Sequence, residues 1–227
     1  IQQPEHLPWL GFFNKMAQVD QFVLLEHVQY KKRYFENRNR ICSAEGAQWL
    51  TVPVQTKGRY TQWINEVEID AQQAWHHKYL ASLDRAYARA PHYAERSAGL
   101  CECVAGEWTH LAALNTELIR LLARLCGVDT PLKPSSQLDT GEHRGSELIL
   151  DICRQLEADA YLSGPNGRNY LDLGAFAANG IEVIFHDYHH PKYPQLYEPF
   201  VSHLSTVDAL FNVADVDDLV RRCTLSA

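Results

Sequence analysis

The sequence lacks the features of membrane-spanning, secreted and disulfide-stabilised proteins. No apolar run approaches the roughly 18 residues that a transmembrane helix needs. No secretory signal is recognisable at its start. The six cysteines are scattered, and Cys101 and Cys103 are the one close pair. This pattern predicts free thiols in a reducing compartment rather than disulfides or a zinc site, so we expect a cytoplasmic protein.

The motifs of three large enzyme classes are also missing. The chain contains no Gly-x-Ser-x-Gly elbow, no Walker A loop and no Gly-x-Gly-x-x-Gly fingerprint. These absences argue against a serine hydrolase of the α/β type, a P-loop kinase and a dinucleotide-dependent dehydrogenase.

Excess positive charge is absent as well. The formal net charge is −7 and the pI is near 5.9, which argues against non-specific nucleic-acid binding. A carrier tRNA is the one nucleic-acid partner left open. A local basic stretch, 31–33 together with Arg38 and Arg40, fits either a solvated hairpin or the recognition of a phosphate or carboxylate.

The first forty residues predict a strand, a helix and a second strand. Pro4 and Pro8 keep the opening extended, and a helix is expected from Pro8 or Trp9. The apolar run 22–25 is typical of a buried strand. Two strands joined by one helix form a parallel unit, which has a right-handed crossover.

The rest of the chain predicts an α/β fold with two insertions. Residues 41–70 are strand-rich, including a short strand at Val67–Ile69, and residues 73–126 are helical, with an apolar stripe from Trp108 to Leu125. Strands and helices then alternate to about residue 185. We therefore expect one domain, 1–227, with a Rossmann-like open parallel sheet, an inserted β-hairpin region and a helical insertion.

Polar residues follow each expected strand, at positions 135–136, 163–164 and 186–187. The carboxyl ends of parallel strands line the ligand crevice of an open sheet. With Gln3 and His6 after the first strand, this places four loops on one rim. Histidines 186, 189 and 190 raise the possibility of zinc, but their spacing and Pro191 do not fix a tetrahedral site, so we expect no metal.

Several blocks of the sequence resemble the WbqC-like protein family. The similarity covers nearly the whole chain, and its first block, Gln3 to Lys15, is highly specific. The matching residues lie at 3–15, 20–23, 28–30, 37–40, 49–54, 161–164, 170–171, 193–195 and 204–212. The chain departs from the family pattern at His6, where tyrosine is common, and at Glu26, where aspartate is frequent.

The resemblance implies a role in bacterial polysaccharide or secondary-metabolite biosynthesis. A glycine transferase activity has been suggested for some members, so the resemblance implies transfer of a small acyl or aminoacyl group, glycine included, onto a sugar or other small acceptor. Candidate catalytic residues are His6, His77 and Asp20, with one histidine as general base. Candidate substrate-binding residues are Gln3, Trp9, Lys15, Gln29, Asn37, Arg38, Asn39, Arg40, Tyr161, Ser163, Tyr193 and Gln195.

Two other functions remain open on the sequence. The opening is similar in layout to nucleotidylyltransferases, with His6 or Trp9 and Gly11 at a helix start and Ser205–Thr206 at a later one. A nucleotide-dependent adenylyl or nucleotidylyl transferase or ligase would use ATP and magnesium. A non-enzymatic binding module would instead expose an apolar patch.

Overall fold

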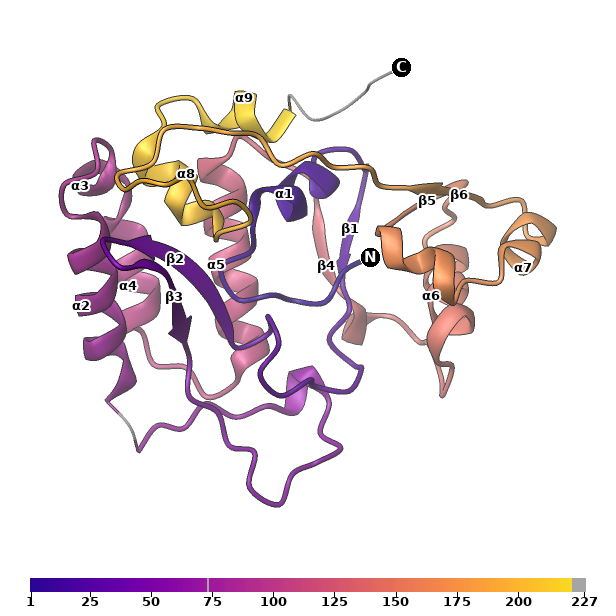
Figure 1. The fold of residues 1–227 in the computed structure, drawn as a ribbon. Helices are drawn as coiled ribbons and strands as arrows, with labels where there is room; N and C mark the ends of the chain where they lie inside the picture. Colours follow the sequence, from indigo (N-terminus) through magenta and orange to yellow (C-terminus); the bar gives the residue numbers. More distant parts are fainter. Residues whose placement is uncertain (73, 222–227) are drawn as a thin grey trace.

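The computed structural model describes residues 1–72 and 74–221 (Figure 1). Gln73, at the start of the expected helical segment, and Cys223 lie outside the described residues. No helix within the described ranges is long and apolar enough to cross a membrane. Each described cysteine is a free thiol.

The N-terminal parallel unit forms as expected. Gln2 pairs in parallel with Leu24, its N–H donating to the Val23 carbonyl at 2.9 Å. Helix α1 (Leu10–Met16) lies between Gln2 and strand β1 (Phe22–Leu24), and β1 pairs in parallel with β4 (Leu132–Pro134). Ala17 caps α1 rather than extending it.

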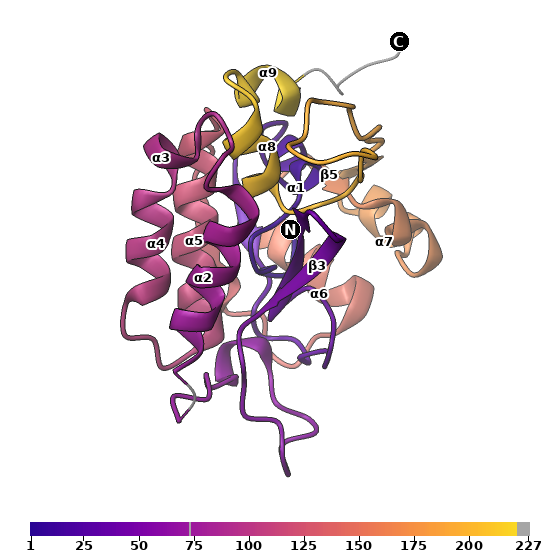
Figure 2. The same ribbon diagram turned by 60° about the vertical axis from the view of Figure 1, so that its left-hand side comes forward.

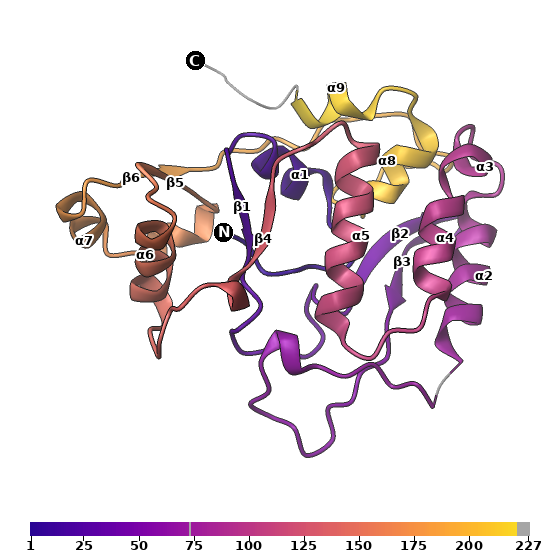
Figure 3. The same ribbon diagram turned by 180° about the vertical axis from the view of Figure 1, so that it is seen from behind.

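A second parallel pair lies on the other side of the N-terminus (Figures 1 and 3). Strands β5 (Ala160–Ser163) and β6 (Glu182–Phe185) pair in register and pack with α6 (Gly145–Gln155) and α7 (Leu173–Ala178). Ile1 packs against the cluster of Tyr161 and Phe176. The α/β expectation is confirmed for these short parallel sheets. The two parallel pairs form separate sheets and not one continuous sheet. The expected Rossmann-like sheet is therefore not confirmed and stays a prediction.

The strand-rich region contains one antiparallel hairpin, β2 (Arg38–Ser43) and β3 (Gly46–Thr51). It turns at Gly46, whose φ of +96° favours glycine. The short strand expected at Val67–Ile69 does not form, because its residues make only isolated bridges, Val54 with Ile69 and Glu68 with His110. The 3₁₀ turn η1 (Ile64–Glu66) precedes them.

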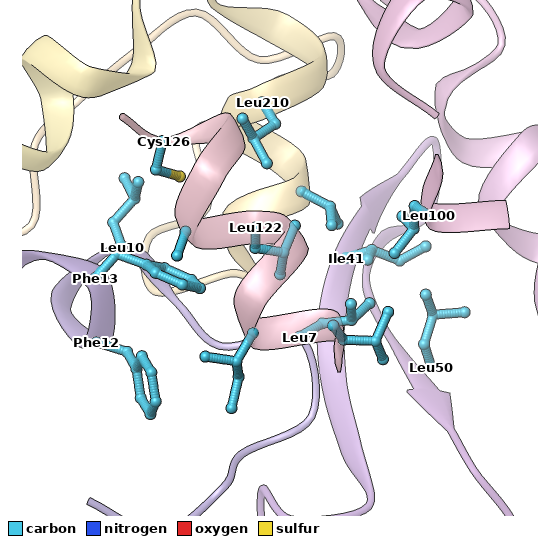
Figure 4. Packing of buried hydrophobic residues seen from close by; sticks show 14 of the residues in the cluster. Leu7, Leu10, Phe12, Phe13, Ile41, Leu50, Leu100, Leu122, Cys126 and Leu210 are labelled. Carbon is cyan, nitrogen blue, oxygen red and sulfur yellow. The ribbon is translucent and has the colours of Figure 1, made fainter. Parts of the chain in front are cut away.

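A layer of helices covers the hairpin (Figure 2). The expected helical segment resolves into α2, α3, α4 and α5, with bounds Trp75–Tyr87, Tyr93–Arg96, Ala98–Ala105 and Leu111–Leu125. Leucines 111, 114, 118 and 122 of α5 are fully buried or nearly so, whereas Leu125 is 36% exposed. Apolar side chains from several elements meet in this core; Figure 4 shows Phe13, Ile41, Leu122 and Leu210.

The C-terminal part of the chain returns over this core. Ser205 caps α8 (Thr206–Asn212), as expected for serine before a helix, and α9 (Val216–Arg221) packs on α1. The remaining short turns are η2 (Ser135–Gln137) and η3 (Pro165–Asn169).

Asp208 of α8 joins three distant parts of the chain. Its carboxylate is fully buried and accepts hydrogen bonds from the Tyr87 hydroxyl at 2.7 Å, the Tyr193 hydroxyl at 2.9 Å and Gln195 Nε2 at 2.7 Å. Tyr87 also accepts the Cys42 N–H, so the network reaches β2. Donors of this kind offset the cost of burying a carboxylate.

Replacing Asp208 with alanine should lower the free energy of unfolding by about 3–5 kcal/mol, because buried donors lose their shared acceptor. Urea unfolding of the variant measures this loss. Asp187→Ala, at a side chain that is 80% exposed, is the matched control and should change stability little. Equal stability of the two variants would contradict the structural role of Asp208.

Candidate functional site

A cavity of about 580 Å³ opens beside the N-terminal segment. This size suits a small-molecule ligand. Three of the four expected loops meet there, since Gln3, Gly164 and His186 each follow a parallel strand segment and line the cavity. The fourth loop does not reach it: Ser135 and Ser136 bond to residues after β1 instead.

Six of the predicted site residues line the cavity together. They come from the N-terminal segment, α1, β2 and β5, which are distant in sequence. They are Gln3, Trp9, Lys15, Asn39, Arg40 and Tyr161.

Two glycines allow the cavity wall to close tightly. A Cβ at Gly11 would lie 2.5 Å from the Trp9 indole, so glycine lets this ring lie against α1. A Cβ at Gly167 would lie 2.0 Å from Ser163 Oγ. Any larger residue at either position would displace a side chain of the wall.

A carboxylate and an amine lie near each other in this cavity. Lys15 Nζ donates to Gln2 Oε1 at 3.2 Å, and Gln2 Nε2 donates to Glu5 Oε1 at 3.2 Å. Burial raises the pKa of Glu5 to about 7, a rise that Glu36 increases. Burial lowers the pKa of Lys15 to about 8, with Glu5 opposing the change. Both groups therefore titrate near neutral pH.

Glu36 is the second buried carboxyl of this region. Its side chain is fully buried, and neither carboxyl oxygen has a hydrogen-bond partner. Burial raises its pKa to about 7, while Lys31 acts in the opposite direction. An unpartnered buried carboxyl destabilises a fold when it ionises, and such groups concentrate at functional sites.

His6 is buried and hydrogen-bonded at both ring nitrogens. Asn115 Nδ2 donates to the Pro4 and Glu36 carbonyls, so its Oδ1 accepts from His6 Nδ1 at 2.9 Å. The Tyr79 hydroxyl then donates to Nε2 at 2.7 Å. Burial lowers the pKa of His6 to about 4, so the ring is neutral. This geometry leaves neither nitrogen for a substrate.

The predicted asparagines hold the backbone. Asn39 Nδ2 donates to the His6 carbonyl at 3.2 Å and to the Leu7 carbonyl at 2.8 Å. Leu7 has a φ of +42°, an unfavourable conformation for leucine that these bonds help to fix. Asn37 Nδ2 donates to the Val52 carbonyl at 2.9 Å, which ties β2 to the chain after β3.

Arg38 and Arg40 lie next to each other on one face of β2, but only Arg40 lines the cavity. The Arg38 guanidinium donates to the Arg33 carbonyl and lies 4.1 Å from the centre of the Trp49 ring. The Arg40 guanidinium lies 3.5 Å from the His203 carbonyl.

Three predicted residues lie on the surface and do not line the cavity. His77 is exposed on α2, with its ring 4.3 Å from that of His76. Asp20 is exposed in the turn before β1. Gln29 is exposed and donates to the Tyr60 carbonyl at 3.2 Å.

Three further predicted residues are occupied within the fold. Tyr193 and Gln195 bind Asp208. The buried Ser163 hydroxyl donates to the Gly164 carbonyl at 3.1 Å.

Sequence reasoning missed the carboxyl groups Glu5 and Glu36, together with Gln2 and Tyr34, of which all but Glu36 line the cavity. The sequence carries one signal for Glu5, because this residue stands between Pro4 and His6 in the loop that is expected to line the ligand crevice. No comparable signal marks Glu36, whose side chain is buried only in the folded chain.

No cluster of three or more metal-ligating side chains exists among the described residues. The three tail histidines diverge. His186 bonds to Asn14 Oδ1 at 2.6 Å, His189 pairs with Asp187 at 3.8 Å, and His190 lies 4.7 Å from the ring of His203.

Comparison with known proteins confirms the predicted family. The model of the WbqC-like protein family matches residues 3–217. A relative from Mycobacterium tuberculosis (strain ATCC 25618 / H37Rv), the uncharacterized protein Rv1507c, is 37% identical over 226 residues, which cover 98% of this chain and 97% of the relative. No solved structure matches the chain.

Glu36→Gln should raise the free energy of unfolding at pH 8 by roughly 1–3 kcal/mol and leave it nearly unchanged at pH 4. The pKa of Glu36 is about 7 in the fold against an ordinary value of 4.5. The unfolded chain therefore loses this proton first, and stability falls as pH rises from 4.5 to 7. Denaturant unfolding at both pH values measures the effect.

The exposed Glu45 provides the control for this experiment. Glu45→Gln should give the same small change in stability at pH 4 and pH 8. A Glu36→Gln variant that behaves like Glu45→Gln would contradict the buried, unpartnered state of Glu36.

Proposed function

The chain belongs to the WbqC-like protein family, and from the chemistry of its cavity we propose that it is a transferase acting on a small molecule. It moves a small acyl or aminoacyl group, with glycine among the candidates, onto an amine or hydroxyl of a sugar-like acceptor. We place the reaction in bacterial polysaccharide or secondary-metabolite biosynthesis, and in the cytoplasm.

The observation that carries this proposal is the Glu5–Gln2–Lys15 chain of hydrogen bonds in the cavity. A general base works best when its pKa lies near the operating pH. Glu5, with a pKa of about 7, meets that condition, and the ammonium of Lys15 supplies positive charge nearby. Such a pair suits removal of a proton from one reactant and stabilisation of negative charge on the other.

The proposed step replaces one bond at the carbonyl carbon by another and transfers one proton. The acceptor nitrogen or oxygen attacks the carbonyl carbon of an activated acyl donor, and its proton passes to the Glu5 carboxylate. The bond from that carbon to the leaving group breaks, and the leaving group keeps the electron pair. Lys15 and Arg40 stabilise an anionic leaving group, such as a phosphate.

Other residues of the cavity orient the reactants. We assign Gln3 and Tyr161 to the acceptor and Trp9 to an apolar contact with the substrate. His6 positions the loop that bears Glu5, because both of its ring nitrogens are held by the protein. This role replaces the general-base role that the sequence suggested for His6 or His77.

The two alternatives have different requirements. A binding module needs an exposed apolar patch, whereas a cavity lined by Glu5, Lys15 and Arg40 supports chemistry on a polar ligand. A nucleotide-dependent adenylyl transferase would use the same cavity. It would then release pyrophosphate from ATP and magnesium in the presence of an acceptor, which a pyrophosphate assay measures.

Glu5→Gln should reduce the turnover rate by about 10²- to 10⁴-fold, because it removes the base while keeping the shape of the side chain. Activity is measured as the mass gain of amino-sugar acceptors with acyl-CoA thioesters, aminoacyl adenylates and charged tRNA as donors. The wild type should show a bell-shaped pH profile. Its rate rises as Glu5 ionises near pH 7 and falls as Lys15 deprotonates near pH 8.

Glu107→Gln, at an exposed position, is the control for the loss of a carboxylate and should keep the wild-type rate. Melting temperatures of both variants establish that they fold. If Glu5→Gln folds and turns over as fast as Glu107→Gln, Glu5 is not the base.

A further inference from the structure

Aromatic and cationic side chains continue from the cavity onto the surface of the hairpin. We call this set the cationic aromatic strip; it consists of Lys31, Tyr34, Phe35, Arg38, Arg40 and Trp49. Lys31, Tyr34, Phe35 and Arg40 line the cavity, whereas Arg38 and Trp49 lie outside it. The strip therefore leads from the solvent to the interior.

The rings of the strip are in contact and partly open to solvent. Phe35 lies 5.9 Å from Trp49 and 5.2 Å from Tyr34, measured between ring centres. Trp49 and Tyr34 are each 45% exposed. An exposed aromatic face is available for stacking on a planar ligand.

The cations of the strip stand over these rings and form no direct ion pair with a carboxylate of the described residues. The guanidinium groups of Arg38 and Arg40 lie 4.1 Å and 5.9 Å from the Trp49 ring centre, and Lys31 Nζ lies 5.3 Å from that of Tyr34. Arg40 is the cross-strand partner of Trp49, which fixes this arrangement. Among the described residues, no carboxylate forms an ion pair with any of these three cations.

Further donors in the strip are unused. The Nε atoms of Arg38 and Arg40 are buried and have no hydrogen-bond partner. The protein as a whole carries a formal charge of −7, so three neighbouring cations form a local basic region that contrasts with the rest of the chain. Cation–π contacts stabilise the hairpin by themselves, but they do not satisfy the Nε donors of the two arginines and do not neutralise positive charge.

We propose that the cationic aromatic strip binds a nucleotide, with the base stacked along Trp49 and Tyr34 and the phosphates held by Arg40 and Lys31 at the mouth of the cavity. Bases stack on aromatic rings and guanidinium planes, and guanidinium groups bind phosphate oxygens through paired donors. The group to be transferred, attached to the phosphate end, then points toward Lys15 and Glu5. This inference rests on the proposed function and names its donor as a nucleotide-linked compound.

A small nucleotide fits the strip better than a long nucleic acid. The strip leads into a cavity of about 580 Å³, which has room for one small molecule. The overall negative charge of the protein opposes extended contact with a polyanion.

Isothermal titration of the wild-type chain with ADP, UDP, adenosine and pyrophosphate tests the proposal. At least one diphosphate should bind more tightly than both adenosine and pyrophosphate, because base and phosphates contribute together. Trp49→Leu should weaken nucleotide binding about tenfold or more and leave pyrophosphate binding unchanged, since it removes a stacking surface. Arg40→Gln should weaken both.

Two substitutions outside the strip serve as controls. Trp63 is also 45% exposed, and Trp63→Leu should leave nucleotide affinity unchanged. Arg89→Gln, at an exposed position on the α2–α3 connection, should do the same. Melting temperatures exclude unfolding as the cause of any loss.

Several outcomes would overturn the inference. The first is that no nucleotide binds. The second is that pyrophosphate binds as tightly as ADP and UDP. The third is that Trp49→Leu and Trp63→Leu change nucleotide affinity equally. Strong binding of tRNA without binding of ADP or UDP would also overturn it, in favour of an RNA surface.

The inference and the proposed function fail in different ways. Nucleotide binding that depends on Trp49, together with full transfer activity in Glu5→Gln, would retain the strip and reject the mechanism. The opposite result would retain the mechanism and reject the strip. In that case Glu5→Gln loses transfer from a donor that carries no nucleotide, and the wild type binds no nucleotide.

Discussion

The candidate site depends on one buried amide, Asn115 of α5. Its Nδ2 donates to the carbonyls of Pro4 and Glu36, and its Oδ1 accepts from His6. One side chain therefore fixes the loop that bears Glu5 and the segment that leads into β2. Without these bonds, three buried polar groups of the backbone and of His6 would lose their partners, each at a cost of about 1–3 kcal/mol. The central helix thus positions the cavity as well as filling the core.

The cavity combines groups that a stable core avoids. Glu5, Glu36 and Lys15 are ionisable, yet burial brings their pKa values toward neutrality. Lys15 belongs to α1, and the bonds of Asn115 to the Pro4 and Glu36 carbonyls hold the backbone beside Glu5 and at Glu36. Reactive groups are commonly held in this way, since the environment that destabilises a charge also tunes its proton affinity.

The polar blocks of the sequence have two different roles. In the stretch 37–40, asparagines and arginines alternate from the residue before β2 into the strand. The asparagine side chains are buried and bind backbone carbonyls, whereas the arginines lie beside Trp49 and are directed to the opposite face of the hairpin. The period of two in a strand produces this separation. The same motif therefore supplies structural amides on one face and candidate ligand-binding cations on the other.

The sequence by itself determined the family, the helices with strong apolar stripes, the parallel unit at the start and the hairpin, because these depend on local periodicity and turn chemistry. It also identified Gln3, Lys15, Arg40 and Tyr161 as cavity residues. Only the tertiary structure decided that His6 is enclosed and that Glu5 and Glu36 are the perturbed carboxyls. Burial and pKa depend on contacts between residues far apart in the chain, such as Asn115 with Pro4, and no local pattern encodes them.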